Sequence, residues 1–200
     1  YFAFERGWPF WPAFVLAYSF TYVFALAVPF FCRTQAQLRQ FVLAGWVGTA
    51  AGVLIYAVLP AIAPLRGTPP DNWVGQWLQL ERGDNIVTAA LPSFHAFWIV
   101  LAACFWRLRL PAVLVLGLAA LQGVACHLTG MHSLADLLAG VLLAVGALNC
   151  ATIWRSGMRA AEWVANDWRP MRLGRMRVFP HAGYVVLAAL VGCLVAACWV

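Results

Sequence analysis

Two polar residues four positions apart, His132 and Asp136, interrupt an apolar stretch of the sequence between Gln122 and Gly140. On a helix, this spacing places both side chains on one face, one turn apart. We expect the Asp136 carboxylate to accept the Nδ1 proton of His132, which leaves Nε2 free to act as a base or a nucleophile. The alternative is a helix start with an acidic residue near its positive end. Because ionisable groups beside a membrane span are costly and usually functional, we interpret the pair as catalytic.

A second polar group, Pro92-Ser93-Phe94-His95, stands where a loop is predicted to become a helix. Proline suits the start of a helix, and Ser93 can cap it. The free N–H groups of the first turn form an anion site, and His95 is expected to face the same anion. The alternative is an ordinary helix start with an interfacial histidine.

Together with two preceding arginines, these groups fit phosphoryl transfer. A phosphate needs N–H donors and arginines around its oxygens, a nucleophile in line with the leaving group, and an acid that protonates the leaving oxygen. We predict that His132, oriented by Asp136, is the nucleophile and that His95 is the acid. The predicted phosphate-binding residues are Ser93, Arg66 and Arg82.

The composition indicates an integral membrane protein. Of the 200 residues, 64% are hydrophobic and only 10% are charged, which is far from a soluble globular composition. We expect an all-α fold, a polytopic transmembrane bundle of about six spans that forms a single domain over residues 1–200. All thirteen basic residues are arginine, and the net charge of +6 is better explained by topology and anionic membrane lipids than by nucleic acid.

The apolar runs also predict a topology. Spans are expected at about 11–31, 41–63, 92–106, 111–127, 132–154 and 182–200. Ten arginines then fall on one side of the membrane, and only Arg6, Arg66 and Arg82 fall on the other. The ten-arginine side is predicted to be cytoplasmic. The polar loop 64–85, in which we expect a short surface helix, therefore shares the non-cytoplasmic face with His95, His127, His132 and Asp136.

The remaining polar features predict less. The six cysteines lie in or beside apolar runs and form no Cys-x-x-Cys pair, so we interpret them as packing residues and not as disulfides or zinc ligands. The basic segment 155–181 is explained by topology and lipid contact.

The two motifs resemble those of the type 2 phosphatidic acid phosphatase (lipid phosphate phosphatase) superfamily, which carries Pro-Ser-Gly-His and a later His-x-x-x-Asp. The resemblance covers residues 66–140. It implies an α-helical membrane bundle that cleaves or transfers phosphate groups of lipids through a phosphohistidine, with neither a metal nor another cofactor. The implied partners are a phosphorylated lipid and the membrane lipids, and the implied site faces the periplasm from a bacterial inner membrane.

Several positions depart from that pattern. The first motif of the family is represented only by Arg66 and Arg82, Phe94 replaces the usual glycine, and Cys126 stands where the family has an arginine. The neighbouring His127 is a candidate to bind phosphate in its place. These departures resemble the branch related to inositol phosphorylceramide synthases, which includes head-group transferases, so hydrolysis and transfer both stay open. Only two spans precede the first motif, and a helix missing before residue 1 would explain this.

Two rival hypotheses remain. One is a non-catalytic, lipid-binding relative, which the missing arginine motifs favour and the intact histidines oppose. The other is a zinc site, because histidine and carboxylate side chains also suit that metal. Its ligands would be His95, His127, His132 and Asp136.

Overall fold

The computed structural model describes residues 5, 7–59, 61, 65–83, 91–166 and 169–197. The predicted topological arginine Arg6 and the last residues of the sixth span, 198–200, lie outside them. The chain forms two compact units, Tyr1–Leu148 and Asn149–Val200. A single catalytic domain over residues 1–200 stays a prediction.

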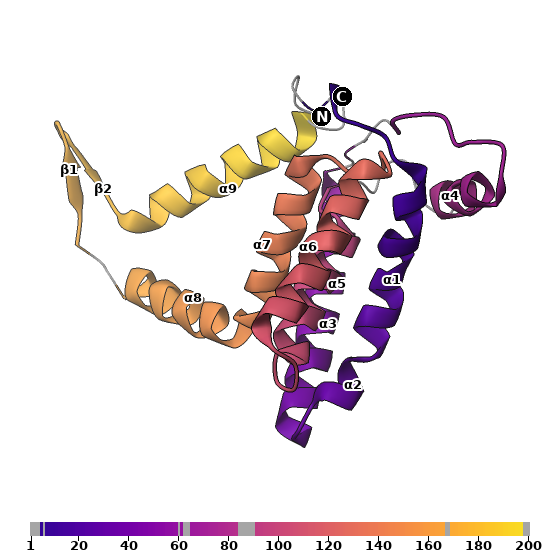
Figure 1. Cartoon of the computed structure of the whole chain (residues 1–200). Coiled ribbons are helices and arrows are strands. Elements are labelled where there is room, and N and C mark those ends of the chain that lie inside the picture. Colours follow the sequence, from indigo (N-terminus) through magenta and orange to yellow (C-terminus); the bar gives the residue numbers. More distant parts are fainter. Residues whose placement is uncertain are drawn as a thin grey trace. The chain divides into compact units, whose positions relative to one another are not determined.

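The first unit is built from helices around a central one. Helix α5 packs against α1, α3, α6 and α7 (Figure 1). Its sequence is apolar on all sides apart from His95, which is typical of a helix enclosed by others. In chain order the elements are a short 3-10 helix η2 (Pro12–Phe14), α1 (Val15–Leu26), α2 (Val28–Phe31), α3 (Gln35–Val58), α4 (Trp73–Gly83), α5 (Phe94–Trp106), α6 (Ala112–Leu128) and α7 (Leu134–Leu148).

Aromatic and aliphatic side chains fill the core of this unit. Phe24 of α1 and both Phe97 and Leu101 of α5 are completely buried. Trp106, at the end of α5, stacks on Phe31 with 4.2 Å between ring centroids, and its Nε1 donates a hydrogen bond of 2.9 Å to the Phe24 carbonyl. The indole is thus buried with its one polar atom satisfied, as a tryptophan in a core requires.

The N-terminal helices differ from the predicted spans. The first predicted span, 11–31, is interrupted because α2 begins a new helix with Pro29 in its first turn, where proline is tolerated. The second begins at Gln35 instead of 41. Thr34 and Gln37 form a capping box there: the Thr34 side chain accepts from the Gln37 N–H, and the Gln37 side chain accepts from the Thr34 N–H.

Later elements confirm some expectations and correct others. Helices α5 and α6 match the predicted third and fourth spans, and α4 confirms the short helix expected within 64–85. The predicted fifth span, 132–154, is not one continuous helix. Helix α7 begins at Leu134 and ends at Leu148, and a separate, strongly amphipathic helix begins at Cys150.

The second unit contains α8 (Cys150–Ala165), the strands β1 (Met171–Leu173) and β2 (Met176–Val178), and α9 (Pro180–Ala197). The strands pair antiparallel, with Arg172 opposite Arg177. Gly174 begins the two-residue turn with φ of +62°, a conformation that glycine adopts without strain. This hairpin contains the only two strands in the described part of a largely helical chain.

By length and composition, one described helix, α3, is long and apolar enough to cross a membrane alone, and α7 with α8 is a second candidate if the two count as one broken span. The other apolar helices are shorter. Large apolar side chains are nevertheless exposed on the first unit, including Trp46 of α3 (73%) and Val113 of α6 (85%). Such surface is unusual on a soluble monomer, but six spans stay a prediction.

Candidate active site

The two motifs meet through their backbones. The Ser93 N–H donates a hydrogen bond of 3.0 Å to the Asp136 carbonyl, which joins the start of α5 to the first turn of α7. A Cβ on Gly140 would lie 2.3 Å from the Ser93 carbonyl oxygen, so only glycine permits this approach. The Ser93 hydroxyl accepts from the Ala96 N–H at 3.3 Å, which confirms the predicted cap of α5.

His95 projects from the first turn of α5 into a cluster of aromatic rings. Its ring stacks on the fully buried Tyr18 of α1 with 3.9 Å between centroids, and its Nδ1 lies 2.9 Å from the Tyr18 hydroxyl. Tyr22, one turn further along α1, contacts the same ring edge-to-face at 5.5 Å. If Tyr18 donates to Nδ1, the His95 proton is left on Nε2, which has no hydrogen-bond partner among the described residues.

His132 lies in the loop between α6 and α7, with its ring centroid 5.8 Å from that of His95. The side chain is 6% exposed, and neither ring nitrogen has a hydrogen-bond partner within the described part of the chain. Burial lowers the pKa of His132 from 6.5 to about 4, so the ring is neutral near pH 7. The backbone is held instead: the His132 N–H donates to the Cys126 carbonyl at 3.2 Å. A neutral, unpartnered imidazole on a fixed backbone is suited to act as a nucleophile.

Asp136 does not make the contact that its spacing predicted. His132 precedes α7, so the two residues do not share a helix face. The Asp136 carboxylate accepts the Ser133 N–H at 2.7 Å, and the Asp136 N–H donates to the Ser133 hydroxyl at 3.2 Å. This reciprocal pair caps α7. The expected hydrogen bond to His132 Nδ1 is therefore wrong for this structure, and a catalytic role for Asp136 stays a prediction.

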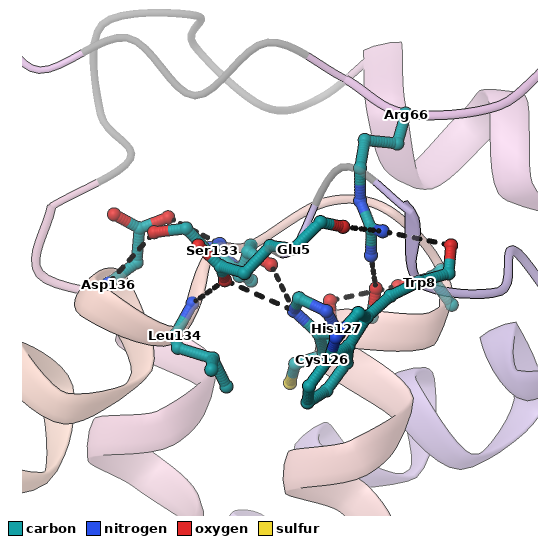
Figure 2. Close-up of polar contacts among 10 residues, drawn as sticks. Glu5, Trp8, Arg66, Cys126, His127, Ser133, Leu134 and Asp136 are labelled. Atoms are coloured by element: carbon teal, nitrogen blue, oxygen red, sulfur yellow. Dashed lines mark hydrogen bonds and ion pairs between the residues drawn. The ribbon is translucent and has the colours of Figure 1, made fainter. Parts of the chain in front are cut away.

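His127, at the end of α6, is buried against the N-terminal segment (Figure 2). Its Nδ1 lies 3.2 Å from the His132 carbonyl oxygen and 3.8 Å from Oε1 of Glu5. The ring of Trp8 packs edge-on against it at 4.6 Å. The structure thus places His127 beside the predicted nucleophile, and phosphate binding by His127 stays a prediction.

The two predicted phosphate-binding arginines contact backbone carbonyls of the same loop. Arg66 donates from Nη2 to the His127 carbonyl at 2.6 Å and from Nη1 to the Glu5 carbonyl at 2.9 Å. Arg82, in the last turn of α4, donates from Nη2 to the Thr129 carbonyl at 3.0 Å and from Nη1 to the Gly67 carbonyl at 2.9 Å. Both guanidinium groups therefore brace the loop that precedes His132. Phosphate binding by Arg66 and Arg82 stays a prediction.

The close approach of the Arg66 segment to this loop depends on Gly130. Gly130 has φ of +69°, and its carbonyl accepts the Arg66 N–H at 3.0 Å. A Cβ at this position would lie 2.4 Å from the Arg66 carbonyl oxygen. Any other residue would strain the turn and push the segment of Arg66 away from the loop.

A cavity of about 630 Å³ opens beside His95, and apart from His95 and two threonines its lining is largely apolar. Residues of α1 and α2 form one wall, and residues of α3 and α5 form the other. They include Thr21, Ala25, Leu26, Thr49, Phe94 and Trp98. His95 lines this cavity and also lies 5.8 Å from His132 between ring centroids, so the cavity adjoins the candidate active site at His95.

The geometry gives no support to the zinc alternative. Across the described residues, no three side chains of histidine, cysteine, aspartate or glutamate are arranged to hold a metal. Asp136 is directed at Ser133, and Nδ1 of His127 at the His132 carbonyl.

The structure brings the predicted site residues to one end of the bundle and adds two that the sequence analysis missed. Tyr18 was overlooked as one aromatic residue among many in an apolar helix. Glu5 was overlooked within an aromatic-rich segment, although it is the only acidic residue before Asp71. An isolated carboxylate in such a segment was the available signal, since glutamate is rarely buried unless it is paired.

Comparison with known proteins covers most of this unit. A sequence model of the PAP2 superfamily matches residues 10–150, a range that includes the seven predicted site residues. The match ends close to the boundary between the two compact units. No curated protein and no solved structure matches the chain significantly.

Proposed function

The chain belongs to the PAP2 superfamily, and on this premise we propose that it is a membrane-embedded enzyme that hydrolyses a lipid phosphate ester or transfers its phosphoryl group to another hydroxyl. Membership supports a phosphatase or phosphotransferase. The observation that carries the proposal is the His95–His132 pair, with 5.8 Å between ring centroids at the start of two helices. This separation lets one phosphate ester contact both rings.

The proposed reaction has two steps. In the first, a ring nitrogen of His132 attacks phosphorus, the P–N bond forms, and the bond from phosphorus to the lipid oxygen breaks. With the negative phosphate bound, His95 is protonated on both ring nitrogens, Nδ1–H donates to the Tyr18 hydroxyl, and Nε2 gives its proton to the departing oxygen, which leaves a neutral ring. In the second step, water or an acceptor hydroxyl attacks the phosphohistidine and returns its proton to His95. Water yields inorganic phosphate, whereas an alcohol yields a new phosphate ester.

The cavity beside His95 supports a lipid as the substrate. It is largely apolar, and its volume of about 630 Å³ lies within the usual range for ligand sites. A hydrocarbon chain in the cavity would bring the phosphate at its head next to His95. The exposed apolar side chains of α3 and α6 are consistent with a bilayer around this unit.

A head-group transferase of the type related to inositol phosphorylceramide synthase is the second candidate. The substitution of Phe94 and Cys126 into the family motifs favours it. In this version His132 receives a phosphorylated head group instead of a bare phosphoryl group, and a lipid alcohol takes it from the histidine. The residues and proton transfers are otherwise the same.

The test is an assay of purified protein with a panel of lipid phosphates, with and without a lipid alcohol as acceptor. Release of inorganic phosphate identifies hydrolysis, and a new phosphate ester identifies transfer. His181→Ala serves as the control, because His181 lies in α9, beyond the matched range. No turnover of any substrate would contradict the proposal and favour a non-catalytic, lipid-binding relative.

The ten-to-three distribution of arginines supports a site on the non-cytoplasmic side of the membrane, and we propose that this side is the periplasmic face of a bacterial inner membrane. Gln76 is exposed on α4. Gln76→Cys should react with an impermeant thiol reagent applied to spheroplasts. Reaction only after the membrane is disrupted would place the site on the cytoplasmic side.

A further inference from the structure

Glu5 is a buried acidic residue with no part in the proposed reaction. Its side chain is fully buried although the surrounding sequence is aromatic and apolar. Burial of a carboxylate is unfavourable unless hydrogen bonds or opposite charges compensate for the lost water. The contacts of Glu5 therefore indicate what its carboxylate stabilises.

Two side-chain contacts of Glu5 involve His127 and Leu134, which precede and follow His132 in the sequence (Figure 2). Oε1 of Glu5 accepts the Leu134 N–H, the first of α7, at 2.7 Å, and lies 3.8 Å from Nδ1 of His127. A negative charge at this position also interacts favourably with the positive end of the α7 dipole. The carboxylate thus accepts a hydrogen bond from the start of α7 and lies within ion-pair distance of the His127 ring at the end of α6, on the other side of the loop that carries the nucleophile.

The loop between these contacts is held by the same group of residues. Nδ1 of His127 lies 3.2 Å from the His132 carbonyl oxygen, and the His132 N–H donates to Cys126 at 3.2 Å. Arg66 binds the carbonyls of Glu5 and His127, which fixes the N-terminal segment to the loop. The contacts with His127 and Cys126 constrain the backbone of His132, while its ring nitrogens have no hydrogen-bond partner in the described part of the chain.

We propose that Glu5 is a positioning residue for the PAP2 reaction: its carboxylate fixes His127 and Leu134 and so holds the His132 ring at its working distance from His95. The inference rests on the proposed function. Displacing a reacting group by about 1 Å can reduce a rate roughly a hundredfold. A residue with this role affects turnover more than substrate binding.

The test compares Glu5→Ala, Glu5→Gln and the control Glu162→Gln, which makes the same chemical change at an exposed position of α8. Turnover of lipid phosphate, KM and thermal midpoint are measured in detergent. We expect Glu5→Ala to lower kcat on the order of a hundredfold, with KM within about twofold. Glu5→Gln should retain more activity, because its carbonyl oxygen still accepts from Leu134. Glu162→Gln should resemble the wild type.

A double-mutant cycle tests whether Glu5 affects turnover through His127. In a His127→Asn background, Glu5→Ala should have a much smaller effect on kcat than in the wild type. Equal effects in both backgrounds would overturn this route. Hydrogen exchange of the peptide covering 127–136 should also be faster in Glu5→Ala than in Glu162→Gln, because the loop loses two contacts.

The other outcomes are distinct. Unchanged kcat in Glu5→Ala overturns the inference while leaving the phosphatase proposal intact. A lower KM with a higher kcat also overturns it, and would mean that the carboxylate competes with phosphate for the donors around His127. A wild-type protein without activity on any lipid phosphate contradicts the proposed function. In that case, unchanged hydrogen exchange of 127–136 in Glu5→Ala independently overturns the positioning of the His132 loop by Glu5.

Discussion

The two compact units bury very different side chains. In the described part of the first unit, nine polar or charged residues are buried, and most surround the loop before α7. In the described part of the second unit, Val164 alone is buried, and the arginines of α8 and the hairpin are exposed. Because a buried polar group is costly unless it is hydrogen-bonded, the contrast supports the proposed chemistry lying in the first unit. The superfamily match ends close to the boundary between the units.

The largest effect is expected at His132. His132→Ala removes the proposed nucleophile, and turnover should fall to the background measured without enzyme. His95→Ala should differ in kind, because it removes the acid: esters with good leaving groups should lose less rate than lipid alcohol esters. Steady-state assays with both substrate types measure this. Comparable losses for both types would show that His95 is not the acid.

The second-largest loss of activity is expected when the arginines that brace the loop before His132 are substituted. Arg82→Ala leaves the carbonyl of the buried Thr129 without this donor, at a cost of about 1–3 kcal/mol. We expect a lower thermal midpoint and roughly a hundredfold loss of activity, on the order of the loss of an oxyanion donor. Lysine should not restore activity, because it lacks the planar fork of donors. An activity loss at an unchanged midpoint would indicate phosphate binding instead of bracing.

The cavity should control affinity for the lipid chain. Ala25→Trp fills part of the cavity beside His95 and should raise KM for a long-chain lipid phosphate roughly tenfold. KM for a short, water-soluble phosphate ester should stay unchanged, because this ester does not enter the cavity. Equal changes for both substrates would show that the cavity does not hold the chain.

The decrease of kcat/KM at acid pH should reflect the lowered pKa of His132. A neutral ring is needed for attack, and its pKa of about 4 lies below the ordinary value of 6.5. The acid limb of kcat/KM due to this residue should therefore fall near pH 4, not near pH 6.5. The free energy of unfolding should decrease as the pH falls from 6.5 towards 4, because the unfolded chain binds the proton first. A limb near pH 6.5 would contradict a buried, neutral nucleophile.

The smallest effect is expected in the second unit. Arg172 and Arg177 face each other across the hairpin, an arrangement of like charges that contributes no stability. The double substitution Arg172→Ala with Arg177→Ala should leave kcat within about twofold of the wild type in detergent. A loss comparable to that of Arg82→Ala would remove the contrast between the units.

The sequence predicted the residues of the site better than their contacts. The two motifs and the arginines indicated which side chains converge, and Ser93 caps α5 as predicted. The His132–Asp136 contact was wrong, because a spacing of four places residues together only if both lie in the helix. Glu5 and Tyr18 could not be predicted from spacing, since they reach the site from 129 and 77 residues away in sequence. Only tertiary packing determines such contacts.

The helix boundaries show the same limit. The Thr34–Gln37 capping box was visible in the sequence as Thr-x-x-Gln and could have corrected the start of α3. The break after Leu148 could not have been predicted from hydropathy, because apolar residues continue on both sides of Asn149. Hydropathy predicts which segments are apolar, but not where one helix ends and the next begins.

The central claim is tested most directly by trapping the phosphorylated enzyme. Purified protein is mixed with lipid phosphate labelled in the phosphoryl group, and the reaction is quenched within milliseconds in base. The account predicts acid-labile, base-stable label on the peptide that contains His132, in the wild type and not in His132→Ala. Label on another residue, or full turnover in His132→Ala, would contradict it.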